Sequence, residues 1–165
     1  MAAPLTARFT GTIAWLAPME VADLVDWLAG IPFEAWPQQH PWEDGSLRPA
    51  MVNDLDWQGF GKRTEMLTAE ILEHFPGCRA GQRMLSVIMP GHAIPEHADA
   101  QAPDWICRVH VPLTTNVHTG VGMPDGLWWL QQSQAYRFNT EAPHTVWNHG
   151  ATPRTHFLLD VHAHA

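Results

Sequence analysis

The stretch RTHFLLDVH, residues 154–162, alternates between two kinds of side chain and indicates the fold. Phe157, Leu159 and Val161 are spaced by two residues, so on a β-strand they share one apolar face. The opposite face carries Arg154, His156, Leu158 and Asp160. A strand that buries one face and keeps charged groups on the other predicts a barrel with a polar mouth.

Further short segments of this kind follow one another after residue 80. They are RMLSVIMP (83–90), ICRVHVPL (106–113), GLWWLQQ (126–132), QAYRFNTE (134–141) and HTVWNHG (144–150), separated by Pro, Gly and Asn. In 106–112, Arg108 and His110 point to one side, with Ile106 and Pro112, while Cys107, Val109 and Val111 point to the other. This pattern predicts a mainly β fold, an antiparallel sandwich or jelly roll with flanking helices (α+β).

The N-terminal part of the chain has a different character. Apolar residues at helical spacing predict helices over 17–30 and 63–75. The segment 31–61 between them is rich in Pro, Trp and acidic residues, and we expect an irregular region that folds over the barrel mouth and helps to select the substrate. The length of 165 residues predicts a single domain, with a helical and irregular part (1–79) and a β core (80–165).

Composition and charge disfavour several kinds of partner and location. The formal net charge is −8, with one lysine and eight arginines, which disfavours a nucleic-acid or anionic-membrane partner. No basic leader followed by an apolar run is evident, and no apolar run approaches about 18 residues. Cys78 and Cys107 are too few for a disulfide framework, so we expect a cytoplasmic protein.

The stretch PGHAIPEHADA, residues 90–100, contains a candidate metal site. His97 and Asp99 project to the same face if they lie on a strand, and another strand can bring His144 alongside. Two imidazoles and one carboxylate leave room on an octahedral Fe(II) for a bidentate cosubstrate and O₂. In a chain with eleven histidines this pattern also arises by chance, so a plain polar loop is the alternative.

Arg154 adds a second signal. A buried arginine in a polar barrel requires an anionic partner. The carboxylate of a cosubstrate suits the guanidinium fork, and a salt bridge to Asp160 is the alternative.

Five runs together resemble the aspartyl/asparaginyl β-hydroxylases, a family of Fe(II)- and 2-oxoglutarate-dependent oxygenases with a double-stranded β-helix fold. They are DLDW (54–57), FPGCRAGQ (75–82), SVIMPGHAIPEH (86–97), CRVHVPL (107–113) and HTVWNHGATPRTHFLLDVH (144–162). The resemblance covers roughly residues 54–162. It implies a cupin-like jelly roll that uses Fe(II), 2-oxoglutarate and O₂ to hydroxylate an amino acid, free or within a peptide, releasing succinate and CO₂.

The resemblance also implies roles for individual residues. His97 and His144 match the iron-binding histidines, and Arg154 matches the residue that binds the distal carboxylate of 2-oxoglutarate. The positions that match the lining of the cosubstrate site are Ser86, Arg108, His110 and Trp57.

Two positions depart from the family pattern. Asp99 replaces a glycine of the mammalian members, which restores a carboxylate ligand and disfavours halogenation. Ile106 replaces an arginine that holds an acidic substrate side chain, which puts an aspartyl substrate in doubt.

Two other classes of function remain as alternatives. The first is a cupin-type metalloenzyme that does not use 2-oxoglutarate, for which the usual extra histidine and glutamate ligands are missing. The second is a non-catalytic metal-binding barrel, against which an intact ligand set argues.

Overall fold

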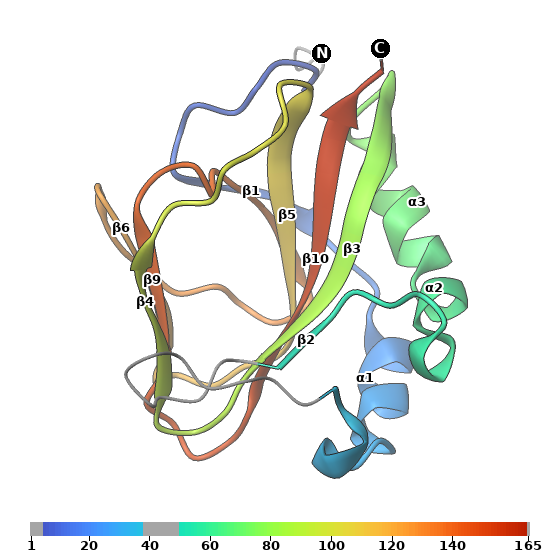
Figure 1. Ribbon diagram of the computed structural model, residues 1–165, viewed down its shortest axis with the longest axis vertical. Coiled ribbons are helices and arrows are strands. Elements are labelled where there is room, and N and C mark those ends of the chain that lie inside the picture. The colour runs from blue at the N-terminus through green and yellow to red at the C-terminus, as the bar shows by residue number, and fades with distance from the viewer. Residues whose placement is uncertain (1–4, 38–49, 165) are drawn as a thin grey trace.

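Two antiparallel β-sheets face each other in the computed structural model, which describes residues 5–37 and 50–164 (Figure 1). The strands are β1 (Ile13–Pro18), β2 (Ala50–Val52), β3 (Cys78–Ile88), β4 (His92–His97), β5 (Trp105–Thr114), β6 (Thr119–Met123), β7 (Gly126–Trp128), β8 (Gln134–Phe138), β9 (His144–Asn148) and β10 (Arg154–Ala163). The large sheet has the order β1-β8-β5-β10-β3-β2, and the small sheet has the order β4-β9-β6-β7. The predicted jelly roll is confirmed.

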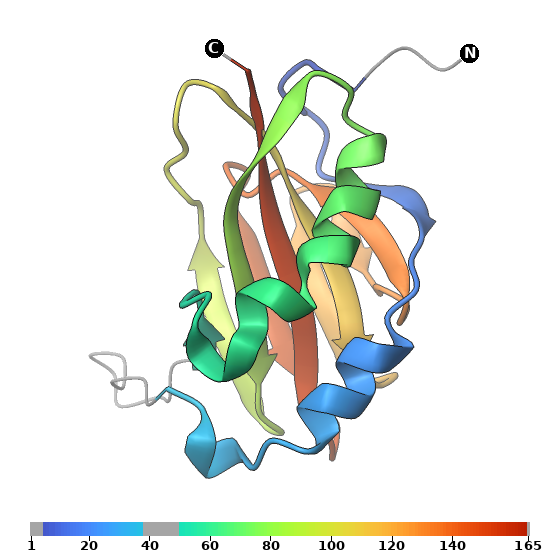
Figure 2. The ribbon, with the colours of Figure 1, turned by 90° about the vertical axis from the view of Figure 1, so that its right-hand side faces the viewer.

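Helices cover the outer face of the large sheet (Figure 2). The helical elements are α1 (Ala22–Ala29), η1 (Phe33–Ala35), η2 (Trp57–Gly59), α2 (Phe60–Arg63) and α3 (Glu65–Glu73). Leu24 and Leu28 of α1 and Ile71 of α3 are buried in the core that also contains Phe157 and Leu159 of β10. Both predicted helices exist, but residues 17–18 end β1 instead of starting α1. Within the described residues, no helix is long and apolar enough to cross a membrane.

The alternation read from the sequence separates the two faces of the large sheet. Val109 and Val111 of β5 lie in the helix-side core, as do Phe157 and Leu159 of β10. Each of these side chains has no exposed area, and burial of such a side chain stabilises the fold by about 1.5–3 kcal/mol. Ile106 also joins this core instead of facing the barrel interior with Arg108 as predicted.

The N-terminal part contributes strands as well as helices. It was expected to be helical and irregular up to residue 79, but β1 pairs with β8 and β2 pairs with β3. The described ends of the segment 31–61 hold η1, β2 and η2. The predicted cover over the barrel mouth falls partly on residues 38–49, which lie outside the described residues.

A tight turn at Pro90-Gly91 carries the chain from the large sheet to the small one. Gly91 has φ of +80°, a left-handed conformation that glycine adopts without a steric penalty. Its N–H donates to the carbonyl of Asn148 (2.8 Å), and the Asn148 amide donates to the carbonyl of Ile88 (2.9 Å). These bonds fix β3 and β4 on facing walls, so that residues on both strands point into the space between the sheets.

Candidate active site

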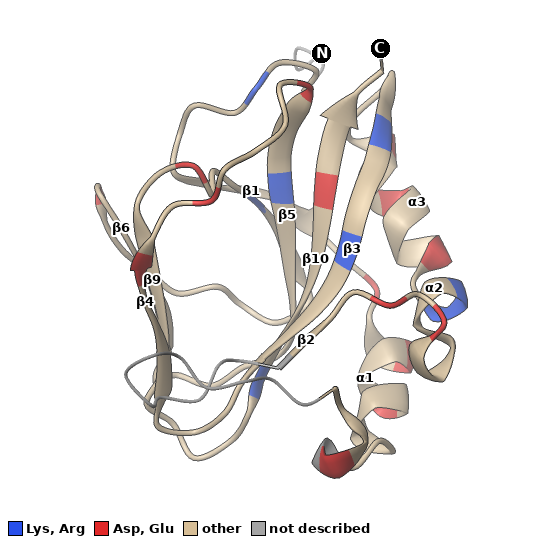
Figure 3. Cartoon of the chain, in the orientation of Figure 1, with Lys and Arg blue, Asp and Glu red and all other residues tan. Residues whose placement is uncertain are grey.

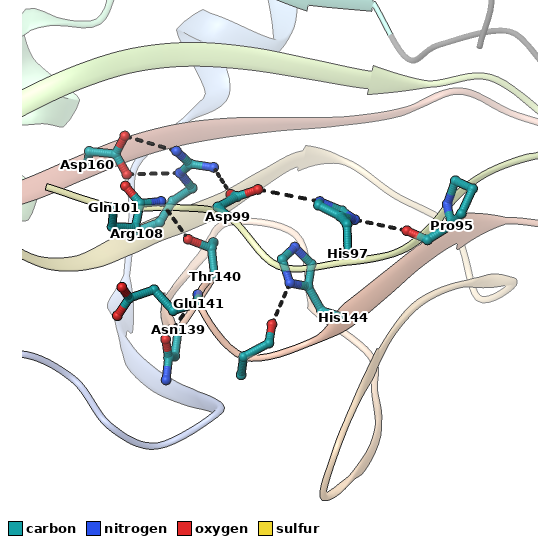
Figure 4. Close-up of polar contacts among 11 residues, drawn as sticks. Pro95, His97, Asp99, Gln101, Arg108, Asn139, Thr140, Glu141, His144 and Asp160 are labelled. Carbon is teal, nitrogen blue, oxygen red and sulfur yellow. Dashed lines mark hydrogen bonds and ion pairs between the residues drawn. The ribbon is translucent and has the colours of Figure 1, made fainter. Parts of the chain in front are cut away.

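The three predicted metal ligands, His97, Asp99 and His144, come together between the sheets (Figure 4). One candidate donor atom from each lies within 4.8 Å of the others. His97 is directly opposite His144 in the pairing of β4 with β9, and their ring centroids are 4.2 Å apart. Asp99 lies beyond the end of β4, not on a strand as expected, and its N–H is held by the carbonyl of Thr140 (2.7 Å).

Backbone carbonyls orient both histidines. Nδ1 of His97 lies 2.9 Å from the carbonyl of Pro95, and Nδ1 of His144 lies 2.8 Å from that of Ala142. A carbonyl only accepts, so in each neutral ring Nδ1 carries the proton and Nε2 keeps its lone pair. Burial lowers the pKa of His144, which favours this neutral form. Such outer-shell bonds are the ones that commonly fix metal-binding histidines.

The Asp99 carboxylate is held by an arginine that is itself anchored. Nη1 of Arg108 donates to Oδ2 of Asp99 (2.9 Å), while Oδ1 of Asp99 lies 3.6 Å from Nε2 of His97. Asp160 accepts from Nε and Nη2 of Arg108 (2.9 and 3.0 Å) and also from the indole of Trp105 (3.1 Å). Figure 3 shows the corresponding basic band on β5 beside the acidic band on β10. One Asp99 oxygen thus remains directed toward the histidines.

This arrangement gives Arg108 two partners within the fold. The resemblance implied that Arg108 lines the cosubstrate, which stays a prediction, and its guanidinium is bound to Asp99 and Asp160. Asp160 was considered as the salt-bridge partner of Arg154, and it instead pairs with Arg108.

Arg154 is buried without a counter-charge among the described residues. Its side chain is on the inner face of β10, the residue is 3% exposed, and its Nη2 donates to Nδ1 of His156 (2.9 Å). Burial lowers the pKa of Arg154 to about 9. Because arginine only donates, His156 is neutral with its proton on Nε2. A buried guanidinium with only a neutral partner is unfavourable unless an anion joins it.

His110 connects this arginine to the metal ligands. Its ring stacks on Phe138 (centroids 4.4 Å apart), and Phe138 packs edge-on against His144 (5.2 Å). Nδ1 of His110 lies 3.5 Å from Nδ1 of His156, and its buried Nε2 has no partner among the described residues. Burial, and then the charge of Arg154, lower the pKa of His110 well below the usual value.

Ser86 and Trp57, which were both predicted to line the cosubstrate, lie in different parts of the fold. Ser86 is buried on β3 directly opposite His156 of β10, and Arg154, His156 and His110 beside it form a group called the Arg154 cluster. Trp57 packs against Trp27 and Trp36 (centroids 6.0 and 5.1 Å) in the helix-side core. Trp57 thus packs with the helix-side core, and the prediction that it lines the cosubstrate gains no support from its contacts.

A cavity of about 520 Å³ opens beside Asp99. Its polar lining comes from Asn53, Gln82, Asp99, Gln101, Arg108 and Asp160. It is the wall of the site that the sequence did not reveal, because Asn53 and Gln82 carry no recognisable motif. His156 and Asp160 were also missed as site residues, although they share the strand face of Arg154 in the alternating stretch 154–162.

The site fits the groups that the sequence indicated. Two neutral imidazoles and one carboxylate form the donor set typical of non-haem Fe(II), with positions left for other ligands. The charge of Arg154, which has no counter-charge among the described residues, offers a dicarboxylate a buried binding place. Cys107, in contrast, faces the helix-side core, and burial raises its pKa to about 12, which excludes a thiolate nucleophile.

A family model described as aspartyl/asparaginyl beta-hydroxylase matches residues 57–164. No curated protein matches the chain.

Solved structures with the same fold are distant in sequence. A viral collagen prolyl hydroxylase from Paramecium bursaria Chlorella virus-1, in complex with 2-oxoglutarate, has a TM-score of 0.64 at 10% identity, over 94% of this chain and 98% of that one. A 2-oxoglutarate-Fe(II) oxygenase family oxidoreductase from Burkholderia pseudomallei has a TM-score of 0.64 at 16% identity (92% and 86%). A Pseudomonas putida prolyl-4-hydroxylase has a TM-score of 0.59 at 16% identity (94% and 95%). These likenesses establish the double-stranded β-helix.

Proposed function

The chain belongs to the aspartyl/asparaginyl β-hydroxylase family, which makes it a 2-oxoglutarate-dependent hydroxylase, and we propose that it hydroxylates an amino acid, free or within a peptide. The reaction converts an unactivated C–H bond, 2-oxoglutarate and O₂ into the alcohol, succinate and CO₂. Bound Fe(II) supplies the oxidising chemistry. The chain supplies the ligands, the orientation of the two substrates and a site shielded from water.

The proposed roles follow from the contacts. His97, Asp99 and His144 hold the iron. Arg154 binds the distal carboxylate of 2-oxoglutarate, and Ser86 and His110 line the same place. We assign Arg108 to positioning Asp99 instead of binding the cosubstrate, because its guanidinium is already bound to two carboxylates.

The observation that carries this proposal is the combination of the ligand trio with Arg154. A metal trio alone suits several classes of metalloenzyme. An arginine that is 3% exposed and has a neutral histidine as its described partner calls for a bound anion. A cupin-type enzyme that does not use 2-oxoglutarate, or a non-catalytic barrel, gives Arg154 no such anion.

Anaerobic addition of Fe(II) and 2-oxoglutarate to the protein tests the proposal. We expect a weak visible charge-transfer band that requires both additions. On admission of O₂, we expect succinate to form in step with the loss of 2-oxoglutarate. Fe(II) binding without any effect of 2-oxoglutarate would favour the cupin-type alternative.

We further propose that the chain acts as a single domain in the cytoplasm, without a nucleic-acid or membrane partner. Both cysteines are free thiols, which suits a reducing compartment. The net charge of −8 disfavours binding to polyanions.

A further inference from the structure

The cavity beside Asp99 is placed to receive the substrate. It shares Asp99 and Arg108 with the candidate metal site, and its lining also includes residues of β2 and β3 and residues 98–101. The Arg154 cluster lies elsewhere on the inner face of β10, so the two regions can be filled at once. At about 520 Å³ the cavity is large enough for an amino-acid side chain and part of its backbone.

The one cationic side chain among the described residues that line this cavity already has partners. Among the described residues, Arg108 is the one cation that lines it, and Asp99 and Asp160 occupy its guanidinium. An acidic side chain that entered would find two carboxylates and no unpaired positive charge. Desolvation of a carboxylate without a counter-charge opposes binding.

Neutral hydrogen-bonding groups supply the rest of the polar wall. The side chains of Asn53 and Gln82 make no hydrogen bond to another described residue, and each carboxamide offers both donors and an acceptor. Gln101 donates to Thr140 Oγ1 (2.8 Å), which fixes its amide. Ile106 is 2% exposed in the helix-side core, so it makes no contact with this cavity.

We propose, on the basis of the proposed function, that this cavity binds a neutral, hydrogen-bonding amino-acid side chain in preference to a carboxylate. Carboxamide walls pair with amide or hydroxyl groups without a net charge, whereas an incoming carboxylate finds no unpaired cationic side chain among the described residues that line the cavity. The chain thereby selects against the aspartyl type of substrate named in its family description.

Matched probes test this selection on the full chain loaded with Fe(II) and 2-oxoglutarate under nitrogen. The probes are asparagine with aspartate and glutamine with glutamate, each as the free amino acid and as the central residue of a capped glycine tripeptide. Calorimetry measures the dissociation constants, so the result does not depend on turnover. We expect the neutral member of the better-bound pair to bind at least tenfold more tightly than the acidic member.

The substitution Gln82→Arg tests whether the cavity is responsible. Gln82 is exposed at the cavity wall, and an added cation there should reduce the preference for the neutral probe about tenfold or reverse it. Gln131→Arg is the matched control, since Gln131 is exposed and lies outside this cavity. A preference that survives Gln82→Arg unchanged would overturn the assignment to this cavity.

The remaining outcomes separate this inference from the proposed function. Equal or tighter binding of the acidic probes, or no binding of any probe to a protein that does bind 2-oxoglutarate, overturns this inference alone. A protein that binds no 2-oxoglutarate contradicts the proposed function itself.

Discussion

Two arginines on the inner face of the large sheet, one partly buried and one fully buried, lie in opposite electrostatic settings. Arg108 of β5 is bound to two carboxylates, Asp99 and Asp160. Arg154 of β10 is bound to neutral His156 and has no carboxylate within ion-pair distance among the described residues. The first charge is satisfied within the fold, and the second is available to a ligand.

This difference assigns each arginine to one task. A compensated arginine fixes its partners, and here it fixes the carboxylate that we propose to hold iron. An uncompensated buried arginine is unfavourable in the free protein and binds an anion strongly, because that anion removes the unfavourable charge. Of the proposed metal ligands, Asp99 is bound to Arg108, and His144 is linked through Phe138 and His110 to the side of Arg154.

The largest expected effect comes from removing a proposed metal ligand, because neither arginine can then contribute to turnover. His97→Ala or His144→Ala should reduce 2-oxoglutarate turnover to background, because water replaces an imidazole donor poorly. Succinate formation and bound Fe(II) are the measurements. His149→Ala is the control, since His149 is exposed and its backbone N–H pairs with His118 away from the trio. Near-normal turnover in either ligand variant would contradict the metal assignment.

Arg108→Met tests whether the arginine that is paired within the fold supports metal binding by holding Asp99. We expect about a 10- to 100-fold loss of Fe(II) affinity, because Asp99 loses its outer-shell partner. The variant should also unfold at a lower temperature, because Asp160 keeps a buried charge without a counter-charge.

Arg108→Lys distinguishes loss of the Asp99 contact from misfolding of the Met variant. It keeps the positive charge and should recover part of the Fe(II) affinity. Arg79→Met is the matched control, because the Arg79–Asp104 pair is largely exposed. If Arg108→Met instead raises the KM for 2-oxoglutarate at saturating Fe(II), Arg108 binds the cosubstrate and the comparison fails.

We expect acid to lower the free energy of unfolding through His156, the neutral partner of Arg154. Burial and the charge of Arg154 hold the pKa of His156 well below its usual value, so folded His156 stays neutral while the unfolded chain takes up a proton below pH ~6.5. The unfolded state then binds more protons, and the free energy of unfolding decreases as pH falls, by at most about 1.4 kcal/mol per pH unit for this residue.

Denaturant titrations between pH 7.5 and 5 measure this dependence. His156→Gln should show a shallower slope than the unsubstituted protein. The control is His118→Gln, at an exposed histidine. Identical slopes for all three proteins would contradict a neutral, buried His156.

The inner face of the sheet was predictable because alternation along a strand is a local property. The polar set Arg154, His156 and Asp160 was visible in the stretch 154–162, and the two helices were visible from their periodicity. Donor chemistry made His97, Asp99 and His144 candidate ligands, and the family resemblance favoured them over a chance pattern. Asp99 reaches the histidines from a loop bound to Thr140 and not from a strand.

The pairing partners were not predictable because they depend on register and packing. Asp160 lies opposite Arg108 through the register of β10 with β5, which no spacing in the sequence specifies. Strands β1 and β2 are recognisable only through their partners β8 and β3. Trp57 lies against the helix-side core because Trp27 and Trp36, distant in sequence, form its packing partners.

The most direct test of the central claim is the affinity of the Arg154→Ala variant for 2-oxoglutarate. Titration of the anaerobic Fe(II) charge-transfer band should show a weakening on the order of 30- to 4,000-fold, equivalent to about 2–5 kcal/mol for a desolvated bidentate pair. Fe(II) should still bind, and Arg154→Lys should recover part of the affinity, since an ammonium lacks the planar fork. Unchanged affinity together with a lowered melting temperature would make Arg154 a scaffold residue and would contradict the account.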